Sequence, residues 1–100
     1  MKKELNFYEK FEEMNIEEKL QVVKETTSQD VLLMLSNNEE WLIRVGVAEN
    51  PNTPSYILNT LGMEDNFSMK QSVFENPNTS PYTLEDLDKE LNYEYPCEDR

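Results

Sequence analysis

Three acidic residues near the carboxyl end of the chain have a spacing that could bind calcium. Asp86, Asp88 and Glu90 alternate with other residues, as the first ligands of an EF-hand loop do. Such a loop also needs glycine at its sixth position and glutamate at its twelfth, where this chain has Leu91 and Cys97. The triplet is therefore interpreted as the solvated surface of a helix end, and we expect no metal site and no cofactor.

The remaining polar residues give little support for catalysis. The chain has no histidine, so the commonest general base and the commonest neutral metal ligand are both absent. Its two glycines, Gly46 and Gly62, cannot form a phosphate-binding loop. The single cysteine, Cys97, has acidic neighbours that disfavour the thiolate and no histidine to activate it. We therefore predict that the protein is not an enzyme.

The charge balance indicates the kind of partner. Of 100 residues, 21 are aspartate or glutamate and 9 are lysine or arginine, which gives a formal net charge of -12. Such a surface repels nucleic acid and anionic membranes and attracts basic proteins. The sequence has a charged start, a single cysteine and no run of transmembrane length. We expect a cytoplasmic protein that binds a basic protein partner, not nucleic acid or membrane, and its oligomeric state stays open.

The elements that position these residues follow a long internal repeat. Residues 47–53, Val-Ala-Glu-Asn-Pro-Asn-Thr, return at 73–79 with one substitution, so the period is 26 residues (73 minus 47). Units of this kind bury their apolar faces by stacking on their neighbours. The positions that share the register are Thr27, Thr53 and Thr79, then Leu32, Leu58 and Leu84, then Leu35, Leu61 and Leu87. The sequence thus predicts an all-α fold, a short solenoid of about three such repeats in which Leu32, Leu58 and Leu84 form one buried ladder.

The repeat also sets the expected domain boundaries. We predict a single domain over residues 1–91, with a capping helix at 3–14 and a degenerate but in-phase repeat at about 16–36. Two clearer repeats follow at about 39–62 and 65–91. The polar acidic tail, residues 92–100, either packs over the last repeat through its tyrosines or stays mobile.

Local motifs predict where helices begin and end and which side chains face inward. The expected caps are Asn15 with Glu18 as a capping box, Thr27, Thr53 before Pro54, either Thr79 or Ser80, and Gly62 as a helix stop. The Asn-Pro-Asn turns are given a structural role, since they end one helix and begin the next. In the middle unit, Leu42, Val45 and Ala48 are expected to face inward with Ile43 beside them. Trp41 either fills the seam between units or is an exposed anchor, and the general burial of large aromatic residues favours the seam.

Two segments resemble a known repeat family. Residues 43–54, Ile-Arg-Val-Gly-Val-Ala-Glu-Asn-Pro-Asn-Thr-Pro, followed by Leu58 and Leu61, resemble a unit of the variant leucine-rich repeat family, and residues 69–87 resemble a second unit. The resemblance implies a right-handed superhelix of alternating α- and 3-10 helices. Some members of that family carry an iron–sulfur cluster on a separate cysteine-rich segment, and one cysteine cannot ligate a cluster in that way.

Two functions from different classes remain. The first is a small acidic protein-binding module, or adaptor, that acts through a helical-repeat surface. The alternative is an acidic mimic of nucleic acid that inhibits a nucleic-acid-binding protein, such as a phage or mobile-element anti-CRISPR. The excess of acids lies in the repeats and the tail, so we place the interaction there. The expected partner-binding residues are Glu39, Glu40, Trp41, Glu64, Asp65, Asp86, Asp88, Glu90, Tyr93 and Tyr95.

Overall fold

Helices make up most of the chain between residues 7 and 93, the part that this computed structural model describes, with side chains described through residue 91. They are α1 (Phe7–Glu12), α2 (Ile16–Glu25), α3 (Gln29–Leu35), α4 (Trp41–Glu49), α5 (Ser55–Leu61), α6 (Phe67–Glu75) and α7 (Pro81–Tyr93). No strand occurs in these described residues, so the all-α prediction is confirmed. The short helices α3 and α5 are α-helices of 7 residues each and not 3-10 helices.

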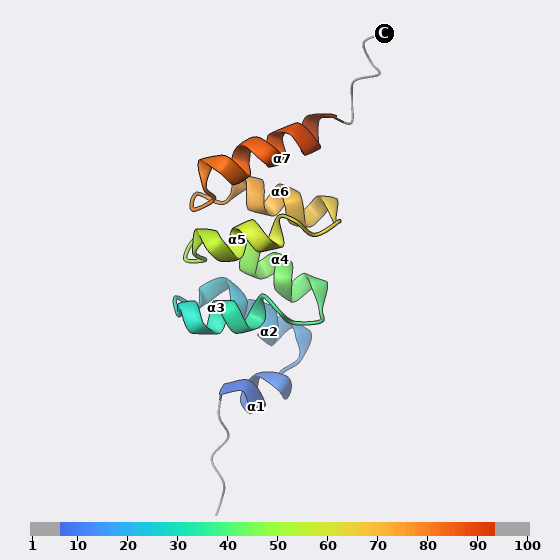
Figure 1. Cartoon of the computed structure of the whole chain (residues 1–100). Coiled ribbons are helices and arrows are strands. Elements are labelled where there is room, and N and C mark those ends of the chain that lie inside the picture. The colour runs from blue at the N-terminus through green and yellow to red at the C-terminus, as the bar shows by residue number, and fades with distance from the viewer. Residues whose placement is uncertain (1–6, 94–100) are drawn as a thin grey trace, which may run out of the picture.

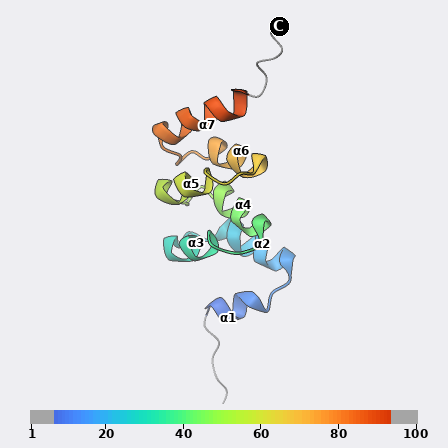
Figure 2. The same ribbon diagram turned by 45° about the vertical axis from the view of Figure 1, so that its right-hand side comes forward.

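The helices are stacked in chain order, from α1 at one end to α7 at the other (Figure 1). α2, α4 and α6 form a row in which each helix packs on the next. α3 lies against α4, and α5 lies against both α4 and α6, on one side of that row (Figures 1 and 2). α7 closes the far end by packing on α6. Most contacts therefore join helices that are close in sequence.

An apolar core runs through the row of helices. Its fully buried side chains include Val23 on α2, Val47 on α4, Val73 on α6, Leu32 on α3 and Leu58 on α5. Leu84, at the next 26-residue position, is only half-buried, because α7 is the last helix described and no described helix covers its outer side. The expected ladder is confirmed at Leu32 and Leu58 and is wrong at Leu84.

The first pair of helices departs from the predicted register. The turn between α2 and α3 has three residues, 26–28, whereas residues 50–54 and 76–80 make the two later turns. The buried valines follow this difference, since Val23 precedes Val47 by 24 residues (47 minus 23) and Val47 precedes Val73 by 26 (73 minus 47). The second helix of the pair is in phase, but the first is displaced by two residues because its turn is shorter.

The buried face of α4 is rotated from the expected one. Ile43, Gly46 and Val47 are buried together with Ala48, whereas Leu42 is 39% exposed. The reason is a close approach of α4 to α2, since a Cβ atom on Gly46 would lie 2.7 Å from Cγ1 of Val23. The rotation also leaves Trp41 44% exposed, so its expected burial in the seam is wrong.

The two Asn-Pro-Asn turns join successive helix pairs through buried amides. The side-chain nitrogen of Asn50 donates to the backbone oxygens of Val23 (2.7 Å) and Thr26 (2.9 Å). That of Asn76 donates in the same way to Ala48 (2.7 Å) and Asn50 (2.9 Å). Each asparagine oxygen also accepts from the backbone N–H two residues later, which shapes the turn. The structural interpretation of these turns is confirmed, and they cross-link the stack as well.

The threonines of these turns have a different role from the predicted one. The hydroxyl of Thr53 donates to the backbone oxygen of Val47 at 2.6 Å, and Thr53 is buried, so it fastens the end of α4 and does not cap α5. Pro54 is itself the N-cap residue of α5. At the equivalent helix the oxygen of Ser80 accepts from the N–H of Thr83 (3.3 Å), so Ser80 is the cap and Pro81 begins the helix.

The remaining caps agree with the sequence in part. Asn15 and Glu18 make both bonds of the predicted capping box, at 2.8 and 3.1 Å. Ser28, one residue after the expected Thr27, caps α3. Gly62 ends α5, but its φ of -67° is right-handed, so glycine is used there for close packing against Val73. The first helix is shorter than residues 3–14, and residues 3–6 lie outside the described part.

Candidate functional site

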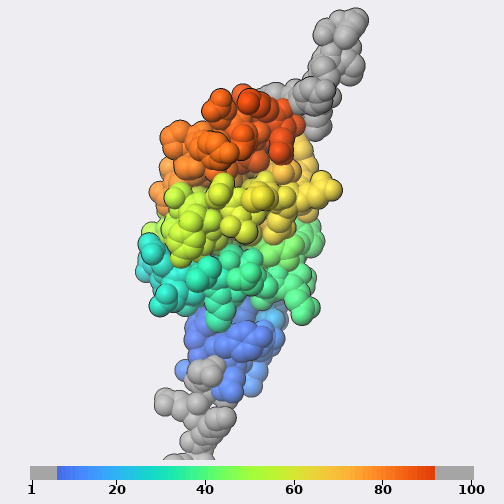
Figure 3. Space-filling view, viewed as in Figure 1, coloured from blue at the N-terminus to red at the C-terminus, as the bar shows by residue number. Residues whose placement is uncertain are grey.

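Two grooves flank the loop between α3 and α4. The first has a volume of about 790 Å³ and opens between α1, α2 and this loop. The second, of about 560 Å³, opens between α3, α4 and α5. Asn37, Asn38 and Glu39 line both grooves, so the loop is a shared wall. Figure 3 shows the face on which α1 lies below α3 and the start of α4, with α5 above them. The grooves therefore form one continuous surface across three levels of the stack.

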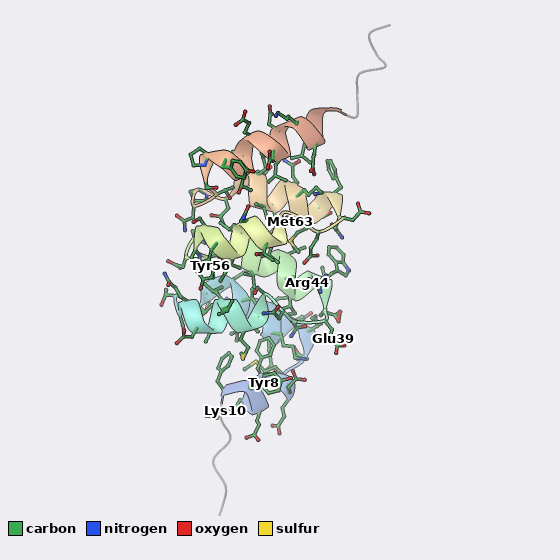
Figure 4. The ribbon with its side chains drawn as sticks, in the orientation of Figure 1. Tyr8, Lys10, Glu39, Arg44, Tyr56 and Met63 are labelled. Atoms are coloured by element: carbon green, nitrogen blue, oxygen red, sulfur yellow. The ribbon has the colours of Figure 1, made fainter. Side chains whose placement is uncertain are left out.

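Arg44 fixes the shared wall. Its guanidinium donates to the backbone oxygens of Asn38 (2.7 Å) and Glu39 (3.1 Å). Two other nitrogens of the same group donate to the carboxylate of Glu64, at 2.9 and 3.1 Å. This bidentate geometry is the strongest form of an arginine–carboxylate pair. Arg44 thus ties the α3–α4 loop to the loop after α5, and Figure 4 shows it above Glu39.

The first groove has an apolar interior and an acidic rim. Ile16, Leu42 and Tyr8 are large side chains that remain substantially exposed there, and buried Leu35 and Ile43 form part of its wall. The ionised side chains that line it are Glu12, Lys19, Glu39 and Glu40, three acids and one base. Lys19 lies over the ring of Phe11, 5.5 Å from its centroid, so this base is already engaged by an aromatic face.

Tyr8 reports on the charge of this groove. The charge of Glu12, with a hydrogen bond to the same carboxylate, raises the pKa of the Tyr8 phenol, and Glu39 adds to the effect from the opposite wall. The phenol therefore stays neutral at physiological pH. In Figure 4, Tyr8 lies below the loop that carries Glu39. Carboxylates from α1 and from the α3–α4 loop thus act on one point of the groove.

The second groove is flatter and carries an aromatic side chain at its edge. Tyr56 on α5 is 56% exposed, and Leu33 on α3 is also exposed beside it in the lining. The ionised side chains here are Arg44, Glu39 and Glu64, of which Arg44 and Glu64 are paired with each other. This groove is therefore close to neutral, and its contact potential is mainly apolar.

The predicted partner-binding residues fall into separate groups. Glu39 and Glu40 are exposed and line the first groove, and Trp41 follows at the first position of α4. Glu64 lines the second groove, and Asp65 is exposed next to it. Asp86, Asp88 and Glu90 are exposed on α7, at the other end of the stack from α1 (Figure 1). Tyr93 ends α7 with its side chain outside the described part, and Tyr95 lies wholly outside it.

Two of these acids are neutralised by cations. Glu64 binds Arg44, and Glu90 lies 2.7 Å from the side-chain nitrogen of Lys70, which also donates to the backbone oxygen of Gly62. Among the described residues, no ion pair engages Glu39 or Glu40. The acids that combine exposure with a place in a groove are therefore those of the α3–α4 loop.

Sequence reasoning missed the apolar residues of the grooves. Tyr8, Ile16, Leu33, Leu42 and Tyr56 were not among the predicted contact residues. Their signal in the sequence is a large apolar side chain that lies off the buried stripe of its helix, and that signal is visible only once the stripe is known. The loop residues Glu39 and Glu40 were predicted, because two acids at a helix start are exposed regardless of packing.

Comparisons with protein-family models, with curated proteins and with solved structures found no match. The site must therefore be interpreted from its own geometry. In the described residues, no helix is long and apolar enough to cross a membrane, and no group of three or more cysteine or acidic side chains is arranged to hold a metal ion.

Proposed function

We propose that this protein is a non-catalytic protein-binding module, or adaptor, whose docking surface is the α3–α4 loop with its two grooves. The observation that carries the proposal is the line of half-exposed apolar side chains, Ile16, Leu42, Leu33 and Tyr56, on both sides of a loop held rigid by Arg44. Exposed apolar groups in a groove with a polar rim are typical of protein interfaces.

The rigidity of the loop favours binding. A preorganised surface loses little conformational entropy on association, so more of the contact energy appears as affinity. The three hydrogen-bonded partners of Arg44 hold the loop before any ligand arrives. Tyr56 supplies an aromatic side chain of the kind that dominates many interfaces.

The architecture proposed with this function is a right-handed solenoid of about three 26-residue repeats, related to the variant leucine-rich repeat family. Its support is the sequence spacing, together with the matching hydrogen bonds of Asn50 and Asn76 to the preceding helix pair. We propose further that the partner is a protein with a basic surface, that the module acts in the cytoplasm, and that it needs no cofactor.

Inhibition by mimicry of nucleic acid is the second candidate. The net charge of -12 and the exposed acids Glu85 and Asp86 on α7 favour it. Mimicry requires a continuous run of unpaired carboxylates, since protein binding to nucleic acid is dominated by its phosphates. The pairs Arg44–Glu64 and Lys70–Glu90 interrupt such a run, which is why the adaptor stands first.

A capture experiment tests the adaptor against the mimic. Immobilised protein is compared with Tyr56→Ser, with Leu42→Ser and with the α7 triple variant Asp86→Lys, Asp88→Lys and Glu90→Lys. Met63→Ser, a change at a 76% exposed residue outside both grooves, is the control. For an adaptor, proteins captured by the parent and the control are lost with the groove variants and kept with the triple variant. The reverse pattern, with release by salt, would favour the mimic and contradict the adaptor.

A further inference from the structure

The first groove combines features that together select one class of ligand. Its apolar wall comes from four elements, with Ile16 from α2, Met34 from α3, Leu42 from α4 and Tyr8 from α1. Its acids, Glu12, Glu39 and Glu40, come from α1 and from the α3–α4 loop, on opposite sides of that wall. A ligand that fills the groove must therefore present apolar groups between two sets of positive groups.

We propose that this groove binds a basic amphipathic helix of a partner protein, whose apolar side chains pack on Ile16 and Leu42 while its lysines or arginines meet Glu12, Glu39 and Glu40. The proposal rests on the adaptor function proposed above and names the partner class of its first groove. Helix-in-groove recognition uses such an arrangement, with apolar anchors three or four residues apart and charged residues on the flanks.

The other common modes of peptide recognition fit this groove less well. The described residues contain no strand, so strand addition to a sheet edge is not available to a ligand here. Anionic ligands such as phosphopeptides or nucleic acid would face three acids and a single base. That base, Lys19, is placed over the ring of Phe11. A basic ligand is attracted by the same charges, which speed its association and weaken as salt rises.

Tyr8 suits the recognition of a cation. Its ring lines the groove, and its phenol is hydrogen-bonded to Glu12, with Glu39 acting on it from the other side. A lysine or arginine of the ligand would therefore meet two carboxylates and the edge of an aromatic ring in one place. Carboxylate pairs of this kind are bridged well by guanidinium, which has several donors in a plane.

Peptide binding tests this directly. The probe is a fluorescent peptide of about 18 residues, five helical turns, with leucines on one face and lysines and arginines on the flanks. Two controls are a peptide of the same composition with the leucines dispersed, and one with every basic residue replaced by glutamate. Anisotropy at low salt is expected to show binding of the probe, with about 10-fold weaker binding of the dispersed peptide and none of the acidic one.

Variants assign the binding to this groove. Leu42→Ser and the double change Glu39→Lys with Glu40→Lys are each expected to weaken the probe by about 10-fold or more, whereas Tyr56→Ser in the second groove and Met63→Ser leave it within about twofold. Circular dichroism confirms that each variant is folded. Equal binding of the probe and the dispersed peptide, or equal loss with all four variants, would overturn the proposal.

The outcome separates this inference from the adaptor function itself. If the probe does not bind but Leu42→Ser abolishes capture of a cellular protein, the adaptor stands and the basic helix is the wrong ligand. If neither measurement responds to Leu42→Ser or Tyr56→Ser, both proposals fail. Sedimentation of the parent as a dimer that Leu42→Ser converts to a monomer would assign the groove to a second copy of this chain and overturn the inference.

Discussion

The amide of Asn50 is predicted to be the strongest single polar link in the stack. Asn50 is 1% exposed, donates to two backbone oxygens of the preceding helix pair and accepts the N–H of Asn52. Asn50→Ala removes these bonds and leaves the oxygen of Val23 in a buried place without this donor. At about 0.5 to 1.5 kcal/mol for each hydrogen bond, the expected loss is about 2 to 4 kcal/mol. That is a large part of the stability of a domain of this size, about 5 to 15 kcal/mol.

The assay is urea denaturation followed by far-ultraviolet circular dichroism, which gives the free energy of unfolding and its dependence on urea. The matched control is Asn52→Ala in the same turn, where the side chain is exposed and the expected change is within about 0.5 kcal/mol. A free energy for Asn50→Ala that equals that of Asn52→Ala would refute the reasoning, because the buried amide would then contribute nothing.

Asn50→Asp adds a dependence on pH with a defined sign. The aspartate keeps an acceptor for Asn52 but places a second oxygen against the carbonyls of Val23 and Thr26. Burial and those carbonyls disfavour the charged form, so the folded-state pKa lies above the unfolded value of about 3.9. Below the unfolded pKa the protonated side chain can donate, and this stability is lost as pH rises through the folded pKa. The variant should therefore approach the parent in acid and differ most near neutral pH.

Four further predictions concern packing and the site. Gly46→Ala should destabilise the fold by about 1 to 3 kcal/mol through its contact with Val23, and in a Val23→Ala background the same change should become neutral or stabilising; a destabilisation that persists there would contradict the close approach. Leu58→Ala should cost about 2 to 5 kcal/mol in urea denaturation, and half-buried Leu84→Ala should cost clearly less, so equal costs would show that the outer side of α7 is covered. Arg44→Lys should keep the fold but speed amide hydrogen exchange in residues 37–40, because lysine cannot make the bidentate pair with Glu64; unchanged exchange would argue against Arg44 as the support of the loop. Glu12→Gln should lower the pKa of Tyr8 in an NMR titration, since the charge of Glu12 is the main cause of its rise, and an unchanged pKa would place Glu12 away from the phenol.

The sequence by itself determined the features that depend on residues close together in the chain. The capping box of Asn15 and Glu18 was predictable because both of its hydrogen bonds span three residues. The end of α4 at Asn50 was predictable because the following proline disfavours a helical conformation there. The all-α class followed from apolar spacing and from a repeated turn, and the burial of Leu32 and Leu58 followed from the 26-residue register.

Tertiary structure decided which face each helix presents and what its side chains contact. Periodicity specifies an apolar stripe, but the close approach at Gly46 selected Ile43 and Val47 over Leu42 on α4, and this exposed Trp41. The hydroxyl of Thr53 could cap α5 or fasten α4, and only the fold of the turn chose the second. The first groove needed the greatest knowledge, since its walls come from α1, α2, α3 and α4, and the pairing of Arg44 with Glu64 spans 20 residues. Contacts over such separations depend on how helices are placed against one another, and that placement is the summed result of packing that no local pattern encodes.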